Sequence, residues 1–286
     1  MLLASVAALA ETPTVKLAPR NGVLRVAIVG DAGGGTEAVA RGIARVHAEK
    51  PLDAIILPGD NIYPCGVRSV NDAGWVALQP LIDLGLPMFP VLGNHDYCGN
   101  PDAQLDAGTR FSEWHFPARE YVLQAGVADF AMIDTTPYVR GKSRAPDVGA
   151  MLSGSTAPWR IVVGHHTIIS SGYHGFFPRD EHHRMRALLK PLRTAHVDLY
   201  ICGHDHHLEL VDSRPRMLVS GAASEPIPPL LLRPRTIFPS DARRQGGFAV
   251  VELTSEAMTI AFYDLGGRGL GVLVALASDR EVVTGR

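Results

Sequence analysis

The sequence of 286 residues predicts an α/β (α+β) fold in which two β-sheets form the core and helices lie outside them. Short apolar runs rich in β-branched residues recur along the chain, and polar clusters, mostly opened by glycine, follow them. The first two runs are separated by a stretch with the apolar spacing of an amphipathic helix. The last runs follow one another with little helix between them, which indicates consecutive strands.

The expected elements can be placed in chain order. The first strand is expected at residues 24–30, which end in Gly30-Asp31, and a helix is expected at residues 36–50. Further strands are expected at residues 54–60, 87–96, 128–134, 159–166, 198–207, 217–221, 246–254, 257–264 and 269–277. Residues 225–239 contain five prolines, which exclude regular helix and central strand. We interpret them as a long surface loop that is either structural or part of the rim of a site.

Composition excludes several classes of protein. The chain is 46% hydrophobic and 20% charged, which is ordinary for a globular protein. Its 27 basic and 29 acidic residues give a net charge of -2, so no positive field is available to hold a nucleic acid. Three cysteines, an odd number, exclude a disulfide framework, although Cys65 and Cys98 could pair. Cys202 lies in a buried-type strand and is expected to be inert.

The first ten residues, MLLASVAALA, are similar to the end of a secretory signal with Ala8-Leu9-Ala10 as its cleavage site. The alternative is a simple apolar tail. A signal remnant would place the protein in the periplasm or outside the cell, and a cytoplasmic location is the alternative. Residues 11–286 are expected to form a single domain. No run approaches the ~18 consecutive apolar residues of a membrane span.

Histidine is concentrated in one part of the chain, because nine of the 12 histidines lie between residues 165 and 207. Imidazole is a common metal ligand and the usual acid or base at neutral pH. The run Gly203-His204-Asp205-His206-His207 stands at the end of an expected strand. In extended backbone the spacing of His204 and His206 points both side chains to the same side.

Each polar cluster alone has a plainer interpretation. Asp31 suits a helix cap for residues 36–50, and Gly59-Asp60-Asn61 suits a turn. Turn chemistry does not explain the histidine in Gly93-Asn94-His95-Asp96. Open α/β sheets bind ligands beyond the carboxyl ends of their strands, so all these clusters are expected at one edge.

Together the clusters offer carboxylate, amide and imidazole groups, a ligand set suited to borderline or hard transition metals. The candidate ligands are Asp31, Asp60, Asn94, His165, His204 and His206. They are too many for one ion. Two metals roughly 3.5 to 4 Å apart would hold the attacking and leaving oxygens of a displacement at phosphorus. One carboxylate between the metals would maintain that spacing.

The five ordered blocks over residues 30–207 resemble the calcineurin-like metallophosphoesterase superfamily. This resemblance implies a four-layer αββα sandwich of two mixed sheets flanked by helices. Most of the superfamily carries a histidine two residues after the first aspartate, whereas here Asp31 is followed by Ala32 and Gly33. Tyr63 follows Asp60 by three residues instead. This exchange resembles the small, tartrate-resistant type of purple acid phosphatase, and a phenolate oxygen favours a trivalent ion such as Fe(III).

The resemblance implies a role for each matching residue. It implies that Asp31, Tyr63 and His206 hold Fe(III), that Asn94, His165 and His204 hold a divalent ion (Fe, Zn or Mn), and that Asp60 bridges the two. His95 and His174, the latter in Gly172-Tyr173-His174-Gly175, match catalytic histidines near the substrate phosphate. Other polar residues are expected only to support the site or to lie on helix faces and the surface. They are Asp96 and Asp205, as carboxylates that orient neighbouring imidazoles, and His166, His207, His182, His183 and His196.

One segment departs from the family. Residues 135–158 are short and lack the family's Gln- and Trp-containing helical stretch and the cysteines of the mammalian disulfide in this region. This departure argues against a regulatory loop over the site but affects none of the expected ligands.

The sequence therefore predicts a dimetal hydrolase of the acid phosphatase type. It would cleave small phosphate monoesters by attack of a metal-bound hydroxide, with His95 and His174 stabilising the phosphoryl charge and protonating the leaving group. A phosphodiesterase or nucleotide hydrolase of the same superfamily, using zinc or manganese, is the nearest alternative. A binding protein without catalysis would require a missing ligand, and all seven positions are filled.

Overall fold

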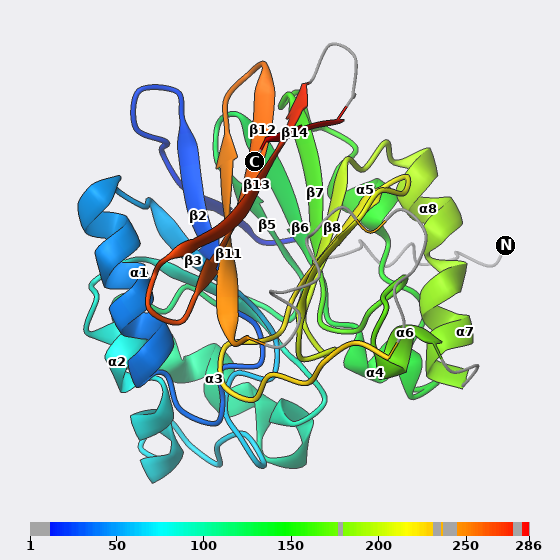
Figure 1. Cartoon of the computed structure of the whole chain (residues 1–286). Coiled ribbons are helices and arrows are strands. Elements are labelled where there is room, and N and C mark those ends of the chain that lie inside the picture. Colours follow the sequence, from blue (N-terminus) through cyan, green and yellow to red (C-terminus); the bar gives the residue numbers. More distant parts are fainter. Residues whose placement is uncertain (1–11, 177–179, 231–235, 237–244, 277–281, 286) are drawn as a thin grey trace, which may run out of the picture.

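The computed structural model describes residues 12–176, 180–230, 236, 245–276 and 282–285. Their strands form two seven-stranded sheets (Figure 1). The first sheet has the order β1 (Thr14–Lys16), β5 (Tyr121–Gln124), β6 (Ala128–Met132), β7 (Trp159–Val163), β8 (Leu199–Cys202), β10 (Arg216–Ser220) and β9 (Leu208–Val211). The second sheet has the order β14 (Val282–Gly285), β13 (Gly269–Leu276), β12 (Ala257–Asp264), β11 (Gly247–Leu253), β2 (Leu24–Ile28), β3 (Ala54–Pro58) and β4 (Met88–Val91).

Both sheets are mixed. The central strands β6, β7, β8 and β10 run parallel, and so do β2, β3 and β4. The chain from β11 to β14 pairs antiparallel, in agreement with the expected run of consecutive strands. Every strand expected from the sequence is present, but each strand that precedes a ligand block stops before its polar cluster. Strands β1, β5, β9 and β14 were not expected.

Helices cover the two outer faces of the sheets. Helices α1 (Glu37–Glu49) and α2 (Gln79–Ile82) lie on one side, and α5 (Val148–Met151), α7 (Asp180–Ala187) and α8 (Leu189–Thr194) lie on the other (Figure 1). Short helices lie near the lower edge in this view: α3 (Pro101–Leu105), α4 (Thr136–Val139) and α6 (Tyr173–Phe176). The remaining turns are 3-10 segments at Ala73–Ala77, Asp96–Cys98 and Asp106–Thr109. This arrangement confirms the four-layer αββα sandwich.

The core explains this layering. One cluster of buried apolar side chains joins the facing sides of the two sheets and the inner face of α1, where Val39, Ile43 and Val46 are buried at helical spacing. A second cluster fills the outer face of the first sheet beneath its helices, with Val162 and Tyr200 of the sheet against Met185 and Leu192. Each sheet therefore buries both faces, which explains why its central strands read as continuous apolar runs.

Two sequence expectations concern the periphery. The expected signal remnant at residues 1–10 lies outside the described residues. Within the described residues, no helix is both long and apolar enough to cross a membrane.

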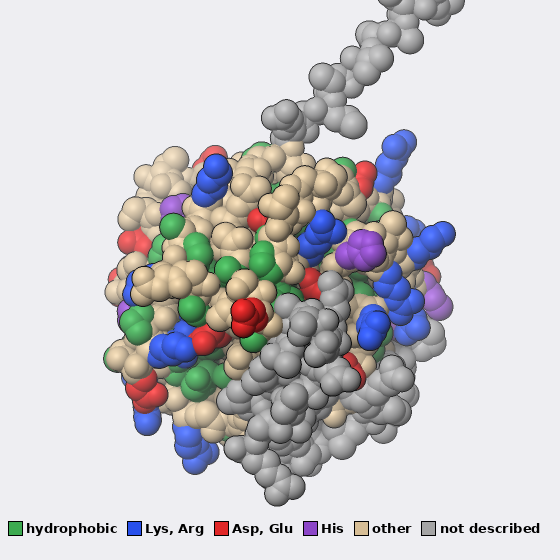
Figure 2. Space-filling view, turned by 90° about the horizontal axis from the view of Figure 1, so that it is seen from above, with side chains coloured by type: hydrophobic (Ala, Val, Ile, Leu, Met, Phe, Trp, Pro, Cys, Tyr) green, Lys and Arg blue, Asp and Glu red, His purple; other side chains and the backbone are tan. Residues whose placement is uncertain are grey.

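Figure 2 shows the end of the molecule where the parallel strands begin. Basic and acidic side chains are interspersed there, in keeping with the small net charge.

Candidate metal centre

The polar clusters meet where strands of both sheets end, at the lower edge in Figure 1. Asp31, Asp60 and Asn94 follow β2, β3 and β4 of the second sheet, and His165 and His204 follow β7 and β8 of the first. The two sheets are joined here by the hydrogen bond from Gly30 N to Ser220 O, 2.9 Å long. The edge expected from the strand pattern is therefore built from two sheets.

Three of the expected ligands occupy left-handed backbone conformations. Asp31, Asp60 and His204 have φ of 57°, 52° and 67°, and among the described residues only Asn21 and His196 are further cases outside glycine. Such a residue costs about 1 to 3 kcal/mol and persists where the surrounding structure holds it. Each of the three comes after a strand and a glycine, and its left-handed φ turns the backbone sharply at that point. The interpretation of Asp31 as a helix cap is wrong, because Thr36 is the residue that precedes α1. The Asp31 carboxylate lies in the site instead, where its Oδ2 accepts a hydrogen bond from His204 N at 2.9 Å.

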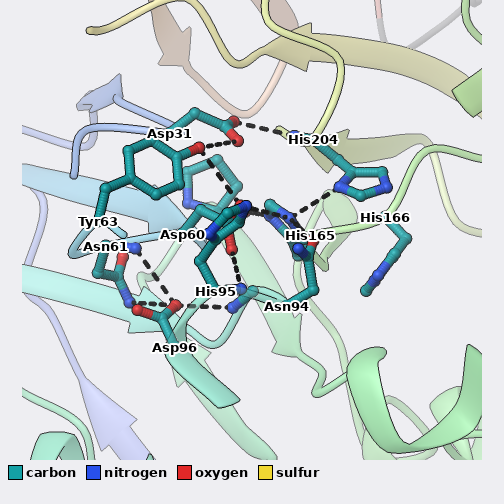
Figure 3. Close-up of polar contacts among 12 residues, drawn as sticks. Asp31, Asp60, Asn61, Tyr63, Asn94, His95, Asp96, His165, His166 and His204 are labelled. Carbon is teal, nitrogen blue, oxygen red and sulfur yellow. Dashed lines mark hydrogen bonds and ion pairs between the residues drawn. The ribbon is translucent and has the colours of Figure 1, made fainter. Parts of the chain in front are cut away.

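The first group of donors surrounds the hydroxyl of Tyr63. This oxygen lies 3.1 Å from Asp31 Oδ1, 3.3 Å from Asp60 Oδ2 and 3.2 Å from His206 Nε2. Figure 3 shows the tyrosine ring directed toward the two carboxylates. The four residues implied for the Fe(III) position, including the bridging Asp60, are thus brought together.

The second group surrounds His165 Nε2. This nitrogen lies 3.1 Å from Asn94 Oδ1, 3.1 Å from His204 Nδ1 and 3.4 Å from Asp60 Oδ2 (Figure 3). The ligand atoms of Asp60, His165 and His204 all lie within 4.8 Å of one another, so these three residues could hold one metal ion. Asp60 Oδ2 belongs to both groups, so it has the place expected of a bridging carboxylate.

The electrostatics of the two groups favour bound cations. Asp31 and Asp60 are almost completely buried. Burial and these two carboxylates raise the pKa of the Tyr63 phenol far above its usual range. Burial opposes charge on His165, yet the Asp60 carboxylate raises its pKa to about 10. Without a cation the site would therefore need protons between its anionic groups, and a metal ion would replace them. The donor set fits two metal ions.

Each of the three imidazoles expected as ligands has one nitrogen turned into the site and the other held by an acceptor. His165 Nδ1 donates to Pro58 O at 3.0 Å, and His206 Nδ1 donates to Glu225 O at 2.9 Å. A carbonyl can only accept, so the proton sits on Nδ1 and the lone pair of Nε2 faces the site. His204 is reversed: Nδ1 faces His165, and Nε2 contacts Glu181 Oε1 at 2.8 Å.

The two expected catalytic histidines lie on the rim. His95 Nδ1 donates to Pro64 O at 2.8 Å, and its Nε2 lies 4.0 Å from Asp60 Oδ2. The side chain is 44% exposed. His174 is the second residue of the short helix α6, and its ring centroid lies 3.7 Å from that of His204. Its Nδ1 lies 3.4 Å from Glu181 Oε1. Both imidazoles can therefore present Nε2 to a substrate.

The role expected for Asp96 and Asp205 is wrong, because among the described residues their hydrogen bonds come from backbone, amide and hydroxyl groups and not from imidazoles. Asp96 accepts from Gly93 N at 2.8 Å and from Gln104 Nε2 at 2.7 Å, which fixes the loop before Asn94. Asp205 accepts from the backbone nitrogens of His174 and Gly175. A buried carboxylate stabilises a loop in this way because several backbone N–H groups converge on it.

Glycines let the loops approach the ligands. A Cβ on Gly93 would lie 2.1 Å from Asp60 Oδ1, and a Cβ on Gly203 would lie 2.2 Å from Asp31 Oδ2. Any other residue would displace a carboxylate of the site. Gly93 and Gly203 are thus required by the positions of the site carboxylates.

The other histidines of the cluster lie outside the two donor groups. His166 bonds Thr135 Oγ1 through Nδ1 at 2.7 Å, although it also lies near Glu181 and His204. His207 Nε2 lies 2.9 Å from Glu209 Oε2, next to the site. His182 and His183 lie on α7. His196 is exposed beyond α8.

One supporting group of the site, Glu181, has no signal in the sequence motifs. Glu181 lies on α7, where no motif marks it, and only its position within the histidine-rich region could have drawn attention to it. The proline-rich segment forms part of the rim: Ile227 N donates to His206 O, and Leu230 N donates to Ser171 O. Of the two interpretations, residues 225–230 therefore fit the one that makes them part of the rim. Residues 231–235 and 237–239 lie outside the described residues.

The structure also shows how the three cysteines are paired. Cys65 and Cys98 form a disulfide with a Cα–Cα distance of 4.8 Å. The bridge connects the loop after Tyr63 with the loop after Asn94. Cys202 is buried, and burial raises the pKa of its thiol well above the usual range, as expected of an inert cysteine.

Fold and donor set together define the class of metal-dependent phosphoesterases. The calcineurin-like phosphoesterase family matches residues 24–208. The chain is 30% identical to purple acid phosphatase 4 of Arabidopsis thaliana, over 91% of this chain and 86% of that one. It is 28% identical to human tartrate-resistant acid phosphatase type 5, over 86% of this chain and 89% of that one. Among solved structures, it matches GAP50, the anchor in the inner membrane complex of Plasmodium, with a TM-score of 0.73 and 27% identity over 88% of both chains.

The chain therefore belongs to the calcineurin-like phosphoesterase family, as a metal-dependent phosphatase related to the purple acid phosphatases.

Proposed function

We propose that this protein is an acid phosphatase that hydrolyses phosphate monoesters with Fe(III) and a divalent ion, Fe, Zn or Mn. The proposed ligands of Fe(III) are Asp31, Tyr63 and His206, those of the divalent ion are Asn94, His165 and His204, and Asp60 bridges. The observation that carries this proposal is the Tyr63 hydroxyl, 3.1 to 3.3 Å from two carboxylates and an imidazole. A phenolate in that place is a hard anionic ligand, which favours a trivalent ion.

When bound, the two metal ions would neutralise the phosphoryl oxygens and activate water as the nucleophile. The protein's own residues then bind and protonate. His95, with Nδ1 held by Pro64 O, directs Nε2 toward the site and would donate from it to a phosphoryl oxygen. His174, with Nδ1 beside Glu181, would hold a proton on Nε2 and pass it to the oxygen of the departing alcohol.

Turnover of two related esters tests the specificity. With purified protein at acidic pH, we expect 4-nitrophenyl phosphate to be hydrolysed with a higher kcat/KM than bis(4-nitrophenyl) phosphate. A higher kcat/KM for the diester would favour the phosphodiesterase alternative. His95→Ala serves as a matched variant, since the loss of a donor to the phosphoryl oxygen should lower kcat for both esters.

We further propose that residues 11–286 form one catalytic domain and that the protein works in the periplasm or outside the cell. The disulfide between Cys65 and Cys98 supports this location, because disulfides persist in oxidising compartments.

A further inference from the structure

The three imidazoles of the candidate metal centre are oriented by different kinds of acceptor. Backbone carbonyls hold His165 and His206, through Pro58 O and Glu225 O. His204 is held by the Glu181 side chain, which lies on a separate helix, α7. The orientation of His204 therefore depends on one side chain that belongs to none of the ligand blocks.

We propose that Glu181 is a positioning residue that fixes His204 with Nδ1 toward the divalent ion and holds the proton donor His174 beside it. This inference rests on the proposed function, since it assumes a metal bound by His204. It assigns a role to a residue that the sequence motifs leave out.

The geometry at His204 supports the first part. His204 Nε2 lies 2.8 Å from Glu181 Oε1, a normal length for a charge-assisted hydrogen bond. A carboxylate only accepts, so the proton of the neutral imidazole sits on Nε2 and the lone pair on Nδ1. Nδ1 is the nitrogen that faces His165 Nε2, at 3.1 Å. Within the described part of the chain, Glu181 Oε1 is the hydrogen-bond partner of His204 Nε2, and without it no other acceptor there would favour this tautomer.

The same carboxylate oxygen also reaches the proton donor. Glu181 Oε1 lies 3.4 Å from His174 Nδ1, and the rings of His174 and His204 are 3.7 Å apart between centroids. The side chain of His204 is 7% exposed and that of Glu181 is 30% exposed, so the contact is largely shielded from water. One oxygen thus links a ligand of the divalent ion to the group that protonates the leaving alcohol.

The position of His166 suggests a competing interpretation. The ligand atoms of His166, Glu181 and His204 lie within 4.8 Å of one another, so Glu181 could instead bind a metal directly. A hydrogen-bond acceptor and a metal ligand respond differently to an amide. Glutamine keeps an oxygen that accepts from Nε2–H but lacks the charge that makes a carboxylate a strong ligand. The variant Glu181→Gln therefore separates the two roles.

The experiment measures the affinity of the divalent position by competition with a chelator. The variants are Glu181→Ala, Glu181→Gln and Asp180→Asn, each prepared with iron in the first position and zinc in the second. Asp180→Asn is the matched control, because it removes the same charge from the exposed neighbouring residue of α7. The tyrosinate absorption of the iron position reports that each variant is folded around its first metal.

We expect Glu181→Ala to weaken zinc binding by about 10- to 100-fold, the usual effect of removing an outer partner of a metal-bound histidine. Glu181→Gln should recover most of this affinity, and Asp180→Asn should match the wild type. Glu181→Ala should also lower kcat more for alkyl than for nitrophenyl esters. Wild-type affinity in Glu181→Ala would overturn the inference, and so would an equal loss in Glu181→Gln. A wild-type protein that binds no second metal would instead overturn the proposed function.

Discussion

Removing the disulfide between Cys65 and Cys98 should lower the thermal stability of the protein by an amount that follows from the length of the loop it closes. The two cysteines are 33 residues apart in sequence. In the chain-entropy treatment, closing a loop of this length stabilises the folded state by about 3.7 kcal/mol. With an unfolding entropy of about 2.1 cal/mol/K per residue, each kcal/mol corresponds to about 1.7 °C in a chain of 286 residues, so removing the bridge should lower the Tm by about 6 °C.

The site should nevertheless keep its geometry without the bridge. Asn100 N donates to Val67 O at 2.7 Å, and Asp96 joins the two loops by accepting from Asn61 N at 3.2 Å and from Gly93 N. These hydrogen bonds hold the loops together independently of the sulfur atoms. We therefore expect the variant Cys65→Ser/Cys98→Ser to keep wild-type kcat at 25 °C while it unfolds at lower temperature.

The assay is thermal unfolding followed by circular dichroism, with and without a thiol reductant. The wild type should lose stability on reduction, and the double variant should be insensitive to it. Cys202→Ala, which leaves the bridge intact, is the control and should respond to the reductant as the wild type does. A double variant as stable as the oxidised wild type would refute the reasoning, as would a loss of activity at 25 °C in a variant that is still folded.

Three further predictions concern the site and its surroundings. His174→Ala should lower kcat by about 10²- to 10⁴-fold for alkyl phosphates and much less for nitrophenyl phosphate; equal losses would exclude His174 as the proton donor. Gly93→Ala should displace the Asp60 carboxylate and lower kcat/KM by about 10²-fold. Gly154→Ala, where a Cβ meets nothing within 4 Å, should be neutral, and a neutral Gly93→Ala would contradict the packing argument. Burial raises the pKa of Asp134 to about 6 from 3.8, so its contribution to stability is complete below pH 4 and is lost as the pH rises through 6. Asp134→Asn should therefore gain up to about 3 kcal/mol over the wild type between pH 4 and 7 in chemical denaturation, and a constant difference would refute this assignment.

The order of the elements could be predicted from the sequence because the central strands are buried on both faces and therefore consist of continuous apolar residues. Residues 54–60 and 159–166 show why the ends were less certain. Each run contains a strand followed by a turn, and the strand stops at Pro58 or Val163 before the glycine. The short strands β1 and β9 carry no such signal. Residues 208–211 directly follow the histidine cluster, which hides the start of β9.

The donor groups of the site could be predicted because each lies within a local block of residues. Their supports could not, since they are contacts between distant segments. Glu181 is 23 residues from His204 in sequence, and the carbonyl of Glu225 is 19 residues from His206. Backbone carbonyls carry no sequence signature at all. The expected roles of Asp96 and Asp205 failed for a related reason, because the backbone N–H groups that they bind are not visible in the sequence.

Metal analysis with a visible spectrum tests the central claim most directly. Protein purified without added metal should contain two metal ions per chain, at least one of them iron, and should show a visible tyrosinate-to-iron charge-transfer band. The variant Tyr63→Phe should lack this band. Two bound metals that include iron without the band, or a band that persists in Tyr63→Phe, would contradict the assignment of Tyr63 as the ligand of Fe(III).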